Sequence, residues 1–174
     1  MTKGNTSKLD AKLTQLIVDI PNYPKEGVTF KDITPLLSSP HFPELVATLA
    51  DEIRDLEIDA IAGVESRGFI LGAAVAHELN VGFVPVRKKG KLPPPVVSQS
   101  YSLEYGEDTV EAKPGSGRVV VLDDVLATGG TLTASAEVLK KAGYDVAGFC
   151  VLMNLTFLNK FQWNGLKANS LIEL

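Results

Sequence analysis

The sequence predicts an α/β fold with a mainly parallel central sheet that is flanked by helices. From about residue 60 onward, short apolar runs alternate with segments of helical length, which is the pattern of strand–helix–strand units. The chain has 174 residues, of which 45% are hydrophobic and 22% are charged, and these values are typical of one folded domain. Glycines and polar residues follow three of the apolar runs, at the sheet edge where α/β folds bind ligands.

The N-terminal part of the chain carries a helical pattern. Leu9, Leu13, Leu16 and Ile20 recur at helical spacing and predict an amphipathic helix over residues 9–20. Prolines end it, and we expect residues 21–40 to be irregular. A second helix is predicted over residues 42–56, with Pro43 in its first turn.

Strands and helices alternate after that point. We predict strands over residues 60–64, 81–86, 118–122 and 146–153, and helices over residues 68–79 and 131–142. Residues 100–111 alternate more weakly and are expected to form a hairpin or an edge pair. The last stretch, residues 159–174, is predicted to be a loop and a late strand. Ligand-binding residues are therefore expected just after residues 64, 86 and 122.

Composition and charge exclude several classes of protein. Seventeen basic and twenty-one acidic residues give a net charge of −4, which argues against a strongly basic nucleic-acid-binding protein. No apolar run reaches the roughly 18–20 residues of a membrane helix, and the polar start lacks a signal-peptide core. The single cysteine, Cys150, predicts a reducing compartment and an inert core thiol. We expect a cytoplasmic protein that binds neither nucleic acid nor membrane. His41 and His77 are interpreted as surface or cap residues and Trp163 as a packing residue.

The most informative segment is residues 119–132, VVVLDDVLATGGTL. A buried strand leads to Asp123 and Asp124, and the small residues that follow open a helix, where backbone amides and the helix dipole favour an anion. The segment is neither a P-loop nor a dinucleotide fingerprint, because no Lys-Ser/Thr pair follows the glycines and the acids precede them. A ribose whose 5′-phosphate occupies the loop would explain the two acids, and one acid could also reach a metal through water. The alternative is a tight turn with solvated acids.

Two further polar loops follow predicted strands. In residues 63–68, Arg67 precedes a helix and suits bidentate anion binding, although it could instead be a surface arginine paired with Glu65. Residues 87–95 read RKKGKLPPP and are interpreted as a mobile basic flap with a stiff base. A solvated charge run or a nuclear-localisation-like patch is the alternative for that segment. Three loops that could each bind an anion follow three successive strands, and this coincidence favours an anion-binding site.

These motifs together resemble one known family. Residues 119–132 resemble the signature of type I phosphoribosyltransferases, which bind phosphoribosyl pyrophosphate (PRPP). Four other segments resemble the family's adenine branch: GVTFKDITPLL (27–37), GVESRGF (63–69), VRKKGKLPPP (86–95) and SYSLEYG (100–106). The matches keep the family's order over roughly residues 20–155. The resemblance implies a single domain over residues 1–174, with an N-terminal base-binding hood to about residue 40, a core over about 41–155 and a flexible catalytic loop over about 87–111.

The resemblance also implies an activity: adenine and PRPP give AMP and pyrophosphate, with Mg²⁺ held mainly by PRPP and with a homodimer as the assembly. It assigns the 5′-phosphate to Ala127, Thr128, Gly129, Gly130 and Thr131, and the ribose hydroxyls to Asp123 and Asp124. It assigns the pyrophosphate to Glu65, Ser66, Arg67, Arg87, Lys88 and Lys91, and the adenine to Thr29, Phe30, Lys31 and Val125. Glu104 would act near the base as a catalytic group, together with Arg67 and Lys88 on the leaving-group side, and Tyr105 would lie on the flap. No protein side chain is expected to bind the metal directly.

Two alternative functions remain open at this point. A relative acting on 6-oxopurines or orotate would usually carry different base-recognition segments. A non-catalytic PRPP sensor would be expected to lose the leaving-group cations, whereas Arg67 and the basic segment are present. After residue 153 the match weakens, since Asn154 stands where many relatives carry an acidic residue, so the C-terminal edge is less certain than the phosphate site.

Overall fold

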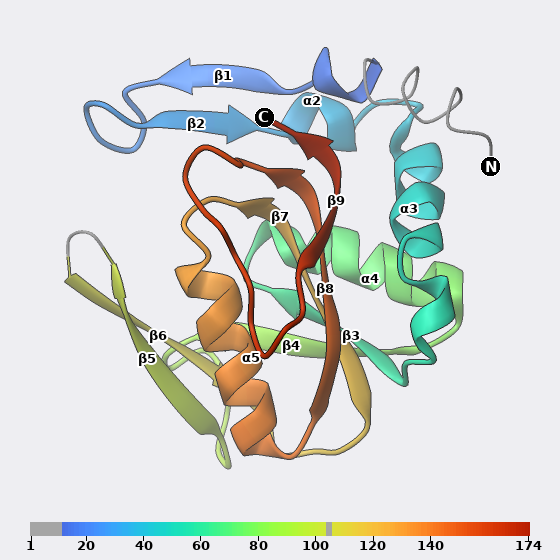
Figure 1. The fold of residues 1–174 in the computed structure, drawn as a ribbon, viewed down its shortest axis with the longest axis vertical. Helices are drawn as coiled ribbons and strands as arrows, with labels where there is room; N and C mark the ends of the chain where they lie inside the picture. The colour runs from blue at the N-terminus through green and yellow to red at the C-terminus, as the bar shows by residue number, and fades with distance from the viewer. Residues whose placement is uncertain (1–11, 104–105) are drawn as a thin grey trace. The chain divides into compact units, whose positions relative to one another are not determined.

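The computed structural model describes residues 12–103 and 106–174, and its chain divides into two compact units, residues 1–46 and 47–174 (Figure 1). The first unit contains a two-stranded antiparallel sheet of β1 (Val18–Pro21) and β2 (Thr29–Asp32), followed by the short helix α2 (Thr34–Leu37). Ile20 pairs with Phe30 across the sheet, and Lys31 forms an ion pair with Asp19 at 2.7 Å.

This sheet corrects two predictions for the N-terminal part. Residues 12–14 are helical, but residues 18–20 belong to a strand and not to the end of the predicted helix. Residues 21–40 include β2 and α2, where irregular structure was expected. The difference arises from tertiary structure. The backbone of Val18–Pro21 pairs with β2, and the helical spacing of the leucines gives no sign of that pairing. Residues 9–11 of the predicted helix lie outside the described residues.

Helix α3 (Phe42–Asp51) is shorter than the predicted helix over 42–56. It is followed by a 3-10 turn, η1 (Arg54–Leu56), in which the Arg54 guanidinium donates to Asp51 at 2.9 Å. The apolar stripe of the sequence continues across this junction, so the pattern alone could not locate the end of the helix.

The second unit contains a seven-stranded sheet with the order β5-β6-β4-β3-β7-β8-β9. Strands β4, β3, β7, β8 and β9 run parallel, and the hairpin of β5 and β6 joins antiparallel to β4. The bounds are β3 (Ala60–Val64), β4 (Gly82–Lys88), β5 (Val97–Leu103), β6 (Gly106–Ala112), β7 (Arg118–Leu126), β8 (Asp145–Asn154) and β9 (Ala168–Glu173). The fold class, the hairpin and the late strand are thereby confirmed.

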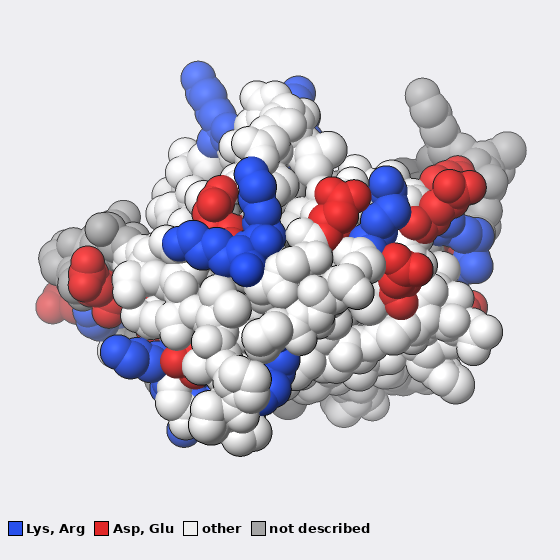
Figure 2. Space-filling view, turned by 90° about the horizontal axis from the view of Figure 1, so that it is seen from below, with Lys and Arg blue, Asp and Glu red and all other residues white. Residues whose placement is uncertain are grey.

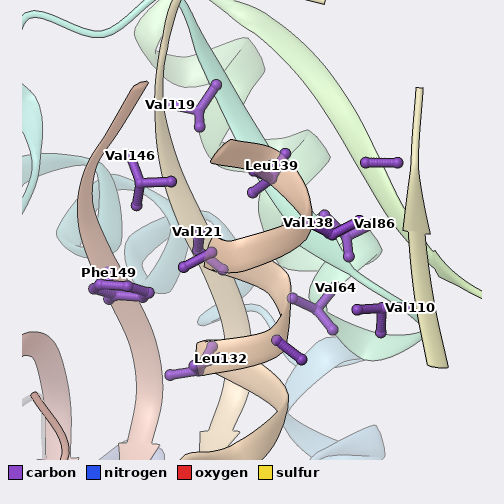
Figure 3. Close-up of a cluster of buried hydrophobic side chains, with 14 of the residues drawn as sticks. Val64, Val86, Val110, Val119, Val121, Leu132, Val138, Leu139, Val146 and Phe149 are labelled. Carbon is purple, nitrogen blue, oxygen red and sulfur yellow. The ribbon is translucent and has the colours of Figure 1, made fainter. Parts of the chain in front are cut away.

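Helices α4 (Arg67–Leu79) and α5 (Gly130–Ala142) cover opposite faces of this sheet. Alternate residues of β3 and β7 point to α5 and form an apolar cluster with Val138 and Leu139, as Figure 3 shows. The other face has room for α4 because Gly63 and Gly72 meet there: a side chain on Gly72 would lie 3.3 Å from the Gly63 Cα atom. Cys150 is fully buried, and burial raises the pKa of its thiol to about 12, which keeps it uncharged.

The parallel register brings three strand ends together. Val64 pairs with Val86, and Gly63 pairs with Leu122. Strands β4 and β7 run past their predicted ends, because β6 pairs with Lys88 and β8 pairs with Leu126. The predicted loop positions of Arg87, Lys88, Asp123 and Asp124 are therefore wrong, since these four residues belong to the two strands, near their carboxyl ends.

On the face that Figure 2 shows, Lys and Arg side chains are interspersed with Asp and Glu side chains. Neither sign of charge forms a large patch there. Among the residues that the structure describes, no helix has the length and apolar character needed to cross a bilayer.

Candidate active site

The segment that joins β7 to α5 forms a short loop at the carboxyl edge of the sheet. Gly129 lies at the helix N-cap with φ of +90°, a conformation that residues with a side chain rarely adopt. Among the described residues no side chain forms a cap hydrogen bond here, so an anion could accept from the first helical amides. Thr128 is exposed beside it. This arrangement is compatible with the predicted phosphate loop.

The two acids before the loop have different surroundings. Arg67 Nε lies 2.8 Å from Asp124 Oδ2, and this pairing is an ion pair without the alignment of a hydrogen bond. Asp123 Oδ1 accepts a hydrogen bond from the Asp124 amide at 2.9 Å. Burial, with the neighbouring Asp124 charge, raises the pKa of Asp123 well above its ordinary value. Burial also raises the pKa of Asp124, although the Arg67 charge opposes that change.

Gly68 explains how Arg67 reaches this pair. A side chain at Gly68 would lie 2.8 Å from the Leu122 carbonyl oxygen and 3.0 Å from Asp123 Oδ1. Only a glycine lets the first turn of α4 approach β7 so closely. The glycine in the sequence GVESRGF therefore sets the distance between Arg67 and Asp124.

Glu65 connects the second loop to the basic segment. Its carboxylate accepts from Arg87 Nε and Nη2 at 3.2 and 3.1 Å, and from the Lys88 amide at 3.0 Å. The hydrogen bonds from Arg87 lower the pKa of Glu65. The structure thus pairs Glu65 with Arg87 and Arg67 with Asp124, in place of the Arg67–Glu65 pair that the alternative interpretation expected.

The rest of the basic segment projects from the end of β4. Arg87 Nη1 donates to the Lys91 carbonyl at 3.1 Å and its guanidinium lies 5.7 Å from the centre of the Phe69 ring. Lys88, an exposed residue, forms an ion pair with Asp108 of β6 at 3.3 Å. Ser66, also exposed, is the N-cap residue of α4. Cationic groups from the start of α4 and the end of β4 therefore lie near the edge of the sheet that carries the two acids.

Sequence reasoning missed two residues that contact the phosphate loop. The Tyr101 hydroxyl lies 3.4 Å from Thr131 Oγ1, and Asn159 Nδ2 donates to the Ala127 carbonyl at 2.7 Å. Tyr101 could have been suspected, because it belongs to the SYSLEYG segment. Nothing in the sequence singles out Asn159.

The remaining predicted residues lie elsewhere in the chain. Thr29, Phe30 and Lys31 follow one another on β2 of the first unit, where Phe30 packs edge-on against Tyr23 with ring centres 5.2 Å apart. Val125 is partly exposed on β7. Glu104 and Tyr105 lie outside the described residues. Across residues 12–103 and 106–174, no group of three or more His, Cys, Asp or Glu side chains gathers in a way that could hold a metal ion.

The chain is similar in sequence to known proteins. Residues 32–158 match the family model of the phosphoribosyl transferase domain. The adenine phosphoribosyltransferase of Bdellovibrio bacteriovorus is 48% identical over 162 residues, which cover 92% of this chain and 98% of that protein. The enzyme of the same name from Maridesulfovibrio salexigens is 46% identical over 93% of this chain and 99% of its own length. The chain belongs to the adenine phosphoribosyltransferase family.

Solved structures of this family share the fold. The adenine phosphoribosyltransferase of Rhodothermus marinus superposes with a TM-score of 0.86 at 40% identity, covering 97% of this chain and 99% of that one. The Saccharomyces cerevisiae adenine phosphoribosyltransferase, solved with an imino-altritol bisphosphate and adenine, gives a TM-score of 0.80 at 34% identity over 94% and 97% of the two chains. The family match ends at Leu158, one residue before Asn159, the residue that contacts the phosphate loop.

Proposed function

We propose that this chain transfers the 5-phosphoribosyl group of PRPP to adenine, giving AMP and pyrophosphate. One observation carries the proposal: the parallel register of β3, β4 and β7 gathers Arg67, Arg87 and the Asp123–Asp124 pair beside an uncapped helix N-terminus. PRPP carries a phosphate at one end of its ribose and a pyrophosphate at the other. Such a molecule needs cations at the pyrophosphate, an anion site at the 5′-phosphate, and groups between them that accept hydrogen bonds from the ribose hydroxyls.

The phosphate loop holds the 5′-phosphate in this proposal. The amides of Ala127–Thr131 and the hydroxyls of Thr128 and Thr131 would donate to its oxygens, and the dipole of α5 adds to the attraction. Asp123 and Asp124 would accept hydrogen bonds from the ribose hydroxyls, and the Arg67 ion pair orients the Asp124 carboxylate for that role.

The leaving group is pyrophosphate, and its departure requires positive charge. We assign Arg67, Arg87, Lys88 and Lys91 to its oxygens, together with the Glu65–Ser66 turn. Glu65 supports this site indirectly, because its two hydrogen bonds fix the Arg87 guanidinium. The reaction passes through a cationic sugar-like state, so positioning and charge stabilisation supply most of the catalysis.

We assign the adenine to Thr29, Phe30, Lys31 and Val125, together with Glu104 and Tyr105. Phe30 would stack on the purine, the backbone at Thr29 and Lys31 would bind its edge, and Val125 would pack against it. Glu104 would take the proton that the purine loses, with Tyr105 beside it. A Glu104→Ala variant is expected to lower kcat far more than it weakens PRPP binding; equal losses of the two would contradict this role.

Mg²⁺, a homodimer and a cytoplasmic location complete the proposal. Carboxylate oxygens are ligands that Mg²⁺ accepts, but Asp124 is paired with Arg67, and Asp123 accepts from a backbone amide. The ion would therefore be held mainly by pyrophosphate oxygens and would neutralise their charge. Gel filtration with light scattering tests the dimer.

The activity is tested with a substrate panel. Purified protein is given PRPP and Mg²⁺ with adenine, hypoxanthine, guanine or orotate, and nucleotide and pyrophosphate are measured. AMP formed from adenine alone supports the proposal. Turnover of another base instead would contradict the adenine pocket, and PRPP binding without any turnover would favour a sensor.

A further inference from the structure

We propose that Asn159 positions the phosphate loop, and that the C-terminal segment 159–161 is therefore part of the 5′-phosphate site. This inference rests on the proposed function of the loop. Its basis is the contact of the Asn159 side chain with the carbonyl of Ala127, the first residue of the loop, at 2.7 Å.

The Asn159 side chain joins three segments. Its amide nitrogen donates to the Ala127 carbonyl, and it also lies 3.1 Å from Asn154 Oδ1 and 3.0 Å from the Leu155 carbonyl. Its Oδ1 accepts from the Phe161 amide at 3.0 Å. An asparagine can make this set because it carries both a donor and an acceptor. The ends of β7 and β8 and the C-terminal segment are thus held at one point.

The contact decides the direction of an amide in the loop. The peptide between Ala127 and Thr128 is trans, so its carbonyl and its N–H point in opposite directions. Asn159 holds the carbonyl toward the C-terminal segment, which turns the Thr128 N–H away from that segment. We infer that Asn159 thereby keeps the Thr128 amide available to the 5′-phosphate.

Phe161 supports the same loop by packing. A side chain at Gly129 would lie 2.8 Å from Phe161 Cδ2, so the ring is in close contact with the N-cap glycine of α5. Phe161 is itself held by Phe149 of β8, with ring centres 4.9 Å apart. The segment is therefore anchored in the core and restrains the loop from one side.

The test compares Asn159→Asp with a matched control, Asn169→Asp. Aspartate keeps the acceptor for the Phe161 amide but cannot donate to the Ala127 carbonyl, which it would repel. Asn169 makes the same kind of bond, from its Nδ2 to the Glu52 carbonyl at 2.8 Å, but lies on β9 away from the loop. Calorimetry measures the Kd of each protein for AMP and for adenine.

The expected result is an AMP affinity at least about tenfold weaker in Asn159→Asp, with adenine affinity unchanged. The KM for PRPP should rise by a similar factor while kcat at saturation changes less. Asn169→Asp should match the wild-type protein. If Asn159→Asp does not fold, Asn159→Ser, which is too short to reach Ala127, should show the same selective loss.

Three outcomes overturn the inference. Unchanged AMP binding in Asn159→Asp or Asn159→Ser, alongside a loss in Thr131→Val, refutes the role of Asn159 while the proposed phosphate loop stands. Equal losses for AMP and adenine would indicate a general structural role. No AMP binding by the wild-type protein would refute the proposed function itself, and the inference with it.

Discussion

The unusual electrostatics of Asp123 lead to a prediction in which stability and activity move in opposite directions. Asp123 is partly buried beside a second carboxylate, and Arg67 forms its ion pair with Asp124. Burial of this charge costs free energy, whereas the proposed ribose site needs a charged acceptor at this position. We predict that Asp123→Asn stabilises the protein at pH 8 and impairs catalysis.

The magnitude follows from the contacts that the substitution keeps. Asparagine has the same shape, and its Oδ1 can still accept from the Asp124 amide, so the 2.9 Å hydrogen bond is retained. The change removes one partly buried carboxylate charge that desolvation and the Asp124 charge destabilise, a situation that costs about 1–3 kcal/mol. Part of the gain is offset because the new NH₂ group needs an acceptor. We therefore expect the free energy of unfolding to rise by about 1–2 kcal/mol.

The pH dependence gives the sharper test. The pKa of Asp123 in the folded protein is raised above its ordinary value of 3.8, so the folded state binds this proton more tightly than the unfolded state does. The Asp123 contribution to stability therefore decreases as pH rises from about 3.8 through its folded pKa. Asp123→Asn should remove that loss, and its advantage should shrink toward zero as pH falls to about 4.

Urea denaturation at pH 4, 6 and 8 measures the effect, with Asp55→Asn as a control at an exposed aspartate. Steady-state kinetics of the same samples should show a lower kcat/KM with PRPP. A variant that is no more stable than the wild-type protein at pH 8 would refute the argument. So would a stability gain of equal size at all three pH values.

Three further predictions concern neighbouring contacts. Gly68→Ala forces a methyl group toward the backbone of β7, where it would lie 2.8 Å from a carbonyl oxygen; it should destabilise the protein by about 1–3 kcal/mol and lower activity, measured by urea denaturation and turnover. Glu65→Gln should weaken PRPP binding through loss of the Arg87 contact. Because the pKa of Glu65 is lowered, its stabilising contribution should be present above pH 4.5 and disappear as pH falls, so wild type and variant should converge in acid. Tyr101→Phe should raise the KM for PRPP by a few fold, and should have no further effect in a Thr131→Val background; additive losses would contradict a direct contact.

Much of the fold could be predicted from local pattern. The strands at residues 60–64 and 146–153 and the helix at 68–79 are nearly as predicted, because a buried parallel strand is a continuous apolar run and the helices between have clear stops. The strand ends were predicted less well, since β4 and β7 are extended by neighbours that lie far away in the sequence. The same reason explains β1, which replaces part of a predicted helix.

The strand–helix junction that carries the candidate phosphate loop was also predicted from the sequence, because small residues and glycines favour the backbone geometry that an anion requires. The ion pairs of the site could not be predicted from the sequence. Two arginines and three acids allow several pairings, and the sequence alone suggested Arg67 with Glu65 as an alternative. The register of three strands and the close approach at Gly68 select Arg67 with Asp124 and Arg87 with Glu65.

The sequence by itself therefore determined the fold class, the family and the place of the candidate phosphate loop between a strand and a helix, since these depend on residue types at short spacing. The tertiary structure alone decided which charges pair, and it brought Asn159 to the Ala127 carbonyl across 32 positions of sequence. Such a contact depends on how β7 and β8 end side by side, and no local pattern records it. A pairing between distant residues is a property of the packed sheet, and only the packed sheet reveals it.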